Sequence, residues 1–170
     1  MKYPYTLDGN SSILLCDIAV PQLPDKIIFE GQELFVKDEF HITLVGAARL
    51  AKIISPDDQG SALDQIIQEF EEFVGVTPLK EYKISNNFRF VEKDERKTII
   101  VMAEVPRIDE LFNRLEQKFS LKLPHQQTHV TLYRYPQDII GIAIPSAEDL
   151  QKFSRTIEVQ ELQKSFTIEG

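Results

Sequence analysis

The sequence predicts a single α+β domain that covers residues 1–170. Helix-like and strand-like runs are interspersed along the chain, and several strand runs have the short, alternating form found in antiparallel sheets. A length of 170 residues is typical of one domain. Apolar residues make up 42% of the chain and charged residues 27%, which is ordinary for a globular protein with a proper core. No low-complexity segment or linker divides the chain.

Two strand-like runs open the chain after a polar, irregular start. The run 13–20, ILLCDIAV, is apolar apart from one aspartate and is typical of a buried strand. The run 40–45, FHITLV, alternates, so His41 and Thr43 are expected on one face of a strand.

The middle of the chain predicts a helix, a hairpin and a second helix. Apolar residues recur at helical spacing after Ser61, the expected N-cap, and Gly75 is the expected stop. The segment 79–105 reads as strands, with the charged residues 92–96 at a hairpin tip. Apolar positions at intervals of three and four predict a helix over 108–119.

The last quarter predicts a strand, a helix and a strand. The run 128–135, THVTLYRY, is the expected strand. Ser146, followed three residues later by Asp149, is the expected N-cap of a third helix. The run 155–162, RTIEVQEL, is expected to close the chain as a strand.

Charge and composition exclude some classes of protein. A net charge of −8, with an isoelectric point of about 4.9, argues against avid binding to long or duplex nucleic acid. The single cysteine, Cys16, cannot form an internal disulfide, which fits a reducing compartment. No secretory signal is expected, and no apolar run approaches the roughly 18 residues that span a membrane. We therefore expect a cytoplasmic monomer with no membrane partner.

Two of the three histidines occur in the same four-residue frame, as HITL from His41 and HVTL from His129. One such motif is unremarkable in a strand, because short motifs arise often by chance. At average composition, a given His precedes apolar, Ser/Thr and apolar residues about once or twice in a hundred. Two of only three histidines doing so is an event of about one in a thousand. The repeated motif therefore points to function.

Strand geometry gives the motif a chemical meaning. Residues at i and i+2 project from one face of a strand about 7 Å apart. Two such strands side by side, or facing each other, present two imidazoles and two hydroxyls to one point. Paired imidazoles suit a reaction that needs a general acid and a general base, because histidine titrates at about pH 6.5. Two hydroxyl donors suit an anion with several oxygens, such as a phosphate diester.

The paired motifs HITL and HVTLYR resemble those of the two-histidine (2H) phosphoesterase superfamily. Within it, the chain looks most like the bacterial 2'-5' RNA ligase-like proteins, which include RNA 2',3'-cyclic phosphodiesterases. The resemblance implies a two-lobed α+β fold with pseudo-twofold symmetry, in which antiparallel sheets face a central cleft and helices pack outside. It also implies catalysis that needs no metal and no cofactor.

The resemblance assigns roles to the motif residues. His41 matches the catalytic histidine that protonates the leaving ribose oxygen, and His129 matches the one that activates water. Thr43 and Thr131 match the threonines that hold the phosphate oxygens.

Two residues after the second motif are further substrate-binding candidates. Arg134 matches a basic residue that assists phosphate binding in the family. Simple alternation from His129 predicts instead that Arg134 points away from the cleft, unless the strand ends or twists there. The same alternation predicts that Tyr133 lies on the cleft face, where it could stack on a base. Other basic residues that could contribute are Arg89, Arg96 and Lys97.

A zinc site at His125 and His129 is not expected, although their spacing would suit one on a helix. The zinc-protease pattern needs Glu where this chain has Gln126, and the segment reads as a loop that enters a strand.

The sequence thus predicts hydrolysis of a 2',3'-cyclic phosphate on a nucleotide or an RNA terminus. Two alternatives remain open. The first is a nucleotide-binding or RNA-binding module of the same fold without turnover. The second is another 2H reaction, the ligation or cleavage of 2'-5' linkages.

Overall fold

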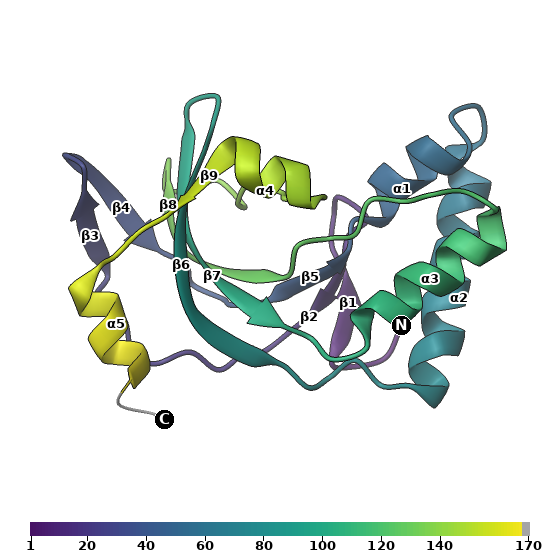
Figure 1. Ribbon diagram of the computed structural model, residues 1–170, viewed down its shortest axis with the longest axis horizontal. Coiled ribbons are helices and arrows are strands. Elements are labelled where there is room, and N and C mark those ends of the chain that lie inside the picture. The colour runs from purple at the N-terminus through teal and green to yellow at the C-terminus, as the bar shows by residue number, and fades with distance from the viewer. Residues whose placement is uncertain (168–170) are drawn as a thin grey trace.

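The computed structural model describes residues 1–167 (Figure 1). In this range the chain forms five helices and one nine-strand sheet with antiparallel strand pairs, which confirms the α+β class. The strands are β1 (Tyr5–Leu7), β2 (Ile13–Leu15), β3 (Lys26–Phe29), β4 (Gln32–Val36), β5 (Ile42–Val45), β6 (Lys83–Lys93), β7 (Arg96–Glu104), β8 (His129–Tyr135) and β9 (Ser154–Thr156). The helices are α1 (Ala47–Ile54), α2 (Gln59–Val76), α3 (Ile108–Phe119), α4 (Ala147–Phe153) and α5 (Gln160–Thr167).

The sheet brings the two H-x-T motifs together at its centre. Its main strand order is β1-β2-β5-β8-β7-β6-β9, so β5 and β8 are neighbours although 88 residues separate their histidines. Along one side β8 pairs with β7. Along the other side it pairs first with β5 and then, near its end, with β4.

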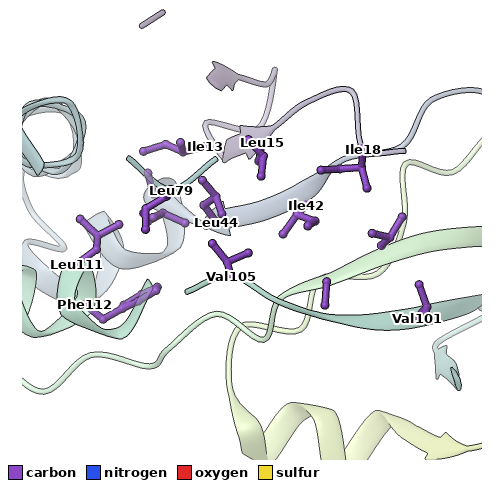
Figure 2. Close-up of a cluster of buried hydrophobic side chains, with 14 of the residues drawn as sticks. Ile13, Leu15, Ile18, Ile42, Leu44, Leu79, Val101, Val105, Leu111 and Phe112 are labelled. Carbon is purple, nitrogen blue, oxygen red and sulfur yellow. The ribbon is translucent and has the colours of Figure 1, made fainter. Parts of the chain in front are cut away.

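One face of the sheet carries the main hydrophobic core. Figure 2 shows part of it, where Ile42 and Leu44 of β5, Val101 of β7 and Leu111 of α3 belong to one cluster of buried side chains. The core continues into α1 and α2, which lie with α3 at one end of the molecule, whereas α5 lies at the other end (Figure 1). Between α2 and α3 the Glu69 carboxylate accepts a hydrogen bond from Arg114 Nε at 2.7 Å.

The opposite face of the sheet carries only a small apolar cluster. It consists of Val91, Ile100, Ile142 and Ile144, with Phe153 of α4 packed against it. The rest of this face, over β5 and the start of β8, is left for the polar side chains of the two motifs.

Several predicted elements are confirmed. The helix over 108–119 is α3, with Asp109 and Glu110 in its first turn and Lys118 in its last, where they complement the helix dipole. The hairpin expected in 79–105 is β6–β7, with its tip at the charged residues. Ser146 is the N-cap of α4, and its hydroxyl accepts a hydrogen bond from the Asp149 N–H at 3.1 Å.

The strands expected over 13–20 and 155–162 are only partly correct. Strand β2 ends at Leu15, because the chain turns at Asp17, which has φ of 55°. Strand β9 ends at Thr156, and helix α5 follows. Leu162 of α5 is fully buried in the main core, so packing of an amphipathic face selected a helix where local pattern indicated a strand.

Helix α2 begins earlier than expected. Its N-cap is Asp58, whose carboxylate accepts a hydrogen bond from the Ser61 N–H at 3.2 Å, and the helix continues through Gly75 to Val76. The sequence interpretation did not identify β1, β3, β4 or α1.

None of the helices within residues 1–167 combines the length and the apolar character needed to cross a membrane.

Candidate active site

The two H-x-T motifs meet around one residue pair. Strands β5 and β8 run antiparallel, with Ile42 opposite Val130. Both of these side chains are fully buried in the main core. Because side chains alternate along a strand, the residues on either side of this pair face the opposite way. If this register continues by one residue in each direction, His41 is opposite Thr131 and Thr43 is opposite His129.

All four motif side chains line one cavity of about 580 Å³. They are His41, Thr43, His129 and Thr131. The walls come from the loop before β2, from α1, from Arg96 of β7 and from the loop 138–143. The geometric prediction that both histidines share one cleft is therefore confirmed, whereas their chemical roles are proposals.

The His129 ring has a defined tautomer when it is neutral. Its Nδ1 atom lies 2.7 Å from the carbonyl oxygen of Gln127. A carbonyl oxygen only accepts hydrogen bonds, so Nδ1 carries the proton and donates it. The neutral ring therefore keeps an unprotonated Nε2, which is the arrangement that a general base requires.

Burial lowers the pKa of both cavity histidines. For His41 the main cause is desolvation, the Lys37 ammonium lowers the pKa further, and Asp8 opposes the shift. For His129 desolvation again comes first. The hydrogen bond to the Gln127 carbonyl opposes it, and the charge of His41 lowers the pKa further. Both shifts favour the neutral rings, and a bound anion would favour protonation.

The two threonine hydroxyls are free to bind a ligand. Among the described residues, neither Thr43 Oγ1 nor Thr131 Oγ1 has a protein hydrogen-bond partner. Gly141 lies directly against the second hydroxyl, since a Cβ atom on this glycine would be 3.5 Å from Thr131 Oγ1. Gly141 has φ of 150°, which other residues rarely adopt.

The cavity rim carries both signs of charge, with three basic residues against two acidic ones. The basic residues are Arg49, Lys52 and Arg96, and the acidic ones are Asp8 and Asp138. Within residues 1–167 the side chains of Arg49 and Lys52 form no ion pair. The acidic net charge of the whole chain thus coexists with a locally basic rim that suits a small anion.

The sequence suggested Arg89, Arg96 and Lys97 as further basic residues of the site. Of these, only Arg96 lines the cavity. Arg89 instead donates hydrogen bonds to the hydroxyls of Ser154 and Thr156.

A β-bulge reverses the expected orientations of Tyr133 and Arg134. On β7, Ile100 is opposite Thr131, but the next residue, Ile99, is opposite Tyr133, so Leu132 is an extra residue in β8. Alternation therefore restarts after Leu132.

The expectation that Tyr133 lies on the cleft face is wrong. Its side chain is fully buried in the main core, where its hydroxyl donates a hydrogen bond to the Pro24 carbonyl at 2.8 Å. Burial raises its pKa to about 12. Tyr133 cannot stack on a base without leaving the core.

Arg134 lies on the cleft side of the sheet but does not line the cavity. Its Nη1 donates to the Ile139 carbonyl at 2.9 Å, and its Nη2 lies 3.1 Å from the Asp38 carboxylate. The buried Lys37 ammonium donates to the Ile140 carbonyl at 2.8 Å. Two cations thus hold the loop that forms one wall of the cavity, and Arg134 acts on this wall rather than directly on a ligand.

His125, the third histidine, lies outside the cavity. Its ring stacks on Phe112 with centroids 4.6 Å apart, and its Nδ1 lies 3.2 Å from Asp109. In the part of the chain that the structure describes, no group of three or more His, Cys, Asp or Glu side chains is placed to hold a metal ion.

Sequence reasoning missed Arg49, Lys52 and Gln126 as cavity residues. A signal for the first two exists: apolar residues after Gly46 recur at helical spacing, and a helix there would begin at the end of the motif strand. No comparable sequence signal marks the burial of Lys37 or Gln126.

Comparisons of the chain with protein families, with curated proteins and with solved structures found no match.

Proposed function

We propose that the protein is a metal-independent phosphoesterase of the two-histidine type. In this proposal it hydrolyses the 2',3'-cyclic phosphate of a nucleotide or of an RNA terminus. The observation that carries the proposal is the shared cavity: two antiparallel H-x-T segments turn two imidazoles and two hydroxyls toward one space. A role in the core alone would leave no reason for four polar side chains to converge there.

His129 is the general base. Its Nδ1–H is held by the Gln127 carbonyl, so Nε2 is the nitrogen that takes a proton from water. Burial lowers the pKa of this ring, which keeps it unprotonated before reaction. The water oxygen then forms a bond to phosphorus while one of the two bonds between phosphorus and a ribose oxygen breaks.

His41 is the general acid, and it gives its proton to the ribose oxygen that leaves. Burial lowers its pKa, so the protonated form needs support. The negative charge of the bound phosphate supplies this support, because a nearby anion favours the imidazolium. Thr43 and Thr131 donate hydrogen bonds to the phosphate oxygens, and the basic rim attracts the anion.

We further propose that the fold has the two-lobed, pseudo-twofold organisation of the resembled superfamily, with one H-x-T motif in each lobe. The antiparallel arrangement of the motifs around Ile42 and Val130 supports this, since it relates the two segments by a local twofold. The lobes would then meet between β5 and β8.

The alternative function is a nucleotide-binding module without turnover. The lowered pKa of His41 favours it, because a neutral ring provides no acid. Ligation or cleavage of a 2'-5' linkage uses the same four groups, and the geometry gives it no separate support.

Turnover of 2',3'-cyclic nucleotides and of oligonucleotides with cyclic-phosphate ends tests these functions. The phosphoesterase proposal expects a phosphomonoester product in the presence of a metal chelator, with one ribose isomer dominant. Tight binding of nucleoside monophosphates with no turnover of any cyclic phosphate or 2'-5' linkage would favour the binding module.

A further inference from the structure

A second, mostly apolar cavity of about 240 Å³ adjoins the candidate active site. It lies between α1, the segment before β8 and the start of α4, and its apolar lining includes Leu50, Ile53 and Phe112. Gly46, Arg49 and Gln126 line both this side pocket and the main cavity. Its volume is below that of sites for whole ligands, so it suits one ring system of a larger molecule.

The Gln126 side chain presents a free acceptor at the junction of the two cavities. This residue is only 7% exposed, and its Nε2 donates to the Ile144 carbonyl at 3.0 Å. Because a carbonyl cannot donate, this bond fixes which end of the amide faces which way. The Oε1 atom, which has no hydrogen-bond partner within residues 1–167, faces Gly46, where a Cβ atom would lie 3.6 Å away. Because this acceptor is held in place by the bond at the other end of the amide, an N–H group on a ligand can donate to it.

Arg49 supplies charge at the same junction. Its guanidinium is exposed and has no carboxylate partner among the described residues, so it is available to a ligand. A planar guanidinium pairs with phosphate oxygens and also stacks on flat rings. The junction thus combines a cation, a fixed acceptor and an apolar recess beside the two motifs.

We propose that the side pocket is a nucleobase subsite. The base lies against Leu50 and Ile53, and an N–H group on its edge donates to Gln126 Oε1. The phosphate of the same nucleotide lies at the H-x-T motifs, and Arg49 bridges the two parts. This inference rests on the proposed function of the main cavity, because it assigns the substrate class of that site.

Calorimetric binding of three probes tests the subsite. The probes are adenosine 3'-monophosphate, purine riboside 3'-monophosphate, which lacks the exocyclic amine, and inorganic phosphate. The adenosine compound should bind about 3- to 10-fold more tightly than the purine riboside compound, the size of one neutral hydrogen bond. Gln126→Met should abolish this difference. The Ile144 carbonyl keeps a partner in this variant, because the Gln127 N–H also donates to it at 3.1 Å.

Ile53→Trp tests the apolar recess independently of the hydrogen bond. Ile53 lines the pocket and is 44% exposed, so a larger side chain at this position narrows the pocket without displacing core residues. Affinity for adenosine 3'-monophosphate should fall, because the base loses its place against Leu50, while phosphate binding is unchanged. The matched controls are Ile28→Trp on β3 and Gln65→Met on α2, both exposed and outside the two cavities, which should leave all three affinities unchanged.

The outcomes separate the subsite from the proposed reaction. Equal wild-type affinity for adenosine 3'-monophosphate and inorganic phosphate overturns the subsite, even if cyclic phosphates are hydrolysed. Selective loss in the Gln126 and Ile53 variants, with no turnover of any cyclic nucleotide, supports the subsite and rejects the phosphoesterase. Failure of all three probes to bind overturns the subsite as well.

Discussion

Removing the two cavity histidines one at a time tests the proposed acid and base directly. A positioned acid or base contributes about 10²–10⁴-fold to a rate, which corresponds to about 3–5 kcal/mol of barrier. His41→Ala and His129→Ala should each lower kcat by that factor. Both rings line one cavity and act in one transition state, so the double variant should lose much less than the sum of the two losses.

His125→Ala is the matched control, since His125 is the one histidine that does not line the cavity. Its ring stacks on Phe112, so its removal should lower the free energy of unfolding by about 0.5–1.5 kcal/mol, the contribution of a stacked pair. Its kcat should equal that of the wild type. Urea unfolding of all variants establishes that any lost activity reflects the site and not the fold.

The assay is hydrolysis of adenosine 2',3'-cyclic monophosphate in single-turnover and steady-state conditions, with binding of adenosine 3'-monophosphate measured alongside. The histidine variants should keep most of their affinity, because they lose groups that act in the transition state. Wild-type kcat in both His41→Ala and His129→Ala would refute the acid–base pair. An equal loss of kcat in His125→Ala would show that the loss does not depend on the cavity.

Four further outcomes are expected. Thr43→Val and Thr131→Val should each weaken the binding free energy of inorganic phosphate and raise the reaction barrier by about 1.5–3 kcal/mol, the contribution of one hydrogen bond to a charged group. Calorimetry that detects no change in phosphate affinity would contradict their role. Because the His41 pKa is lowered, this ring loses its acidic proton as the pH rises through a value below 6.5 in the free enzyme, and the lowered pKa of His129 leaves the base unprotonated above a value that is also below 6.5. The profile of kcat/KM should therefore be bell-shaped with its maximum below pH 6.5, and a maximum at pH 8 would oppose this assignment. Lys37→Met removes a nearby positive charge and should raise the His41 pKa, as read from an NMR titration of the ring; an unchanged or lower pKa would argue against this coupling. Tyr133→Phe should cost about 0.5–1.5 kcal/mol of stability in urea and leave KM unchanged, whereas a large rise in KM would return Tyr133 to the substrate site.

Local patterns in the sequence determined several elements of the fold. The spacing of apolar residues predicted α3, because a helix buries one face at intervals of three and four residues whatever surrounds it. The cap at Ser146 predicted the start of α4 for a similarly local reason, since the hydroxyl bonds a backbone N–H three residues away. The sequence also singled out the four motif residues that line the cavity, because one short pattern occurs twice.

Other features depended on contacts between distant segments. The pairing of Ile42 with Val130 joins strands far apart in the sequence, and no local pattern specifies that register. The bulge at Leu132 arises from the pairing of β8 with β7. It sends Tyr133 into the core and Arg134 to the cleft side, the reverse of simple alternation. A single extra residue in a paired strand exchanges the two faces from that point onward.

The chemistry of the cavity was also decided by tertiary structure. The lowered pKa of His41 results from burial and from the Lys37 ammonium, and the free acceptor of Gln126 results from its bond to the Ile144 carbonyl. A sequence names the groups that can titrate or donate. Only the fold fixes their desolvation, their neighbours and the direction in which each one points, and these three quantities set what the same side chains can do.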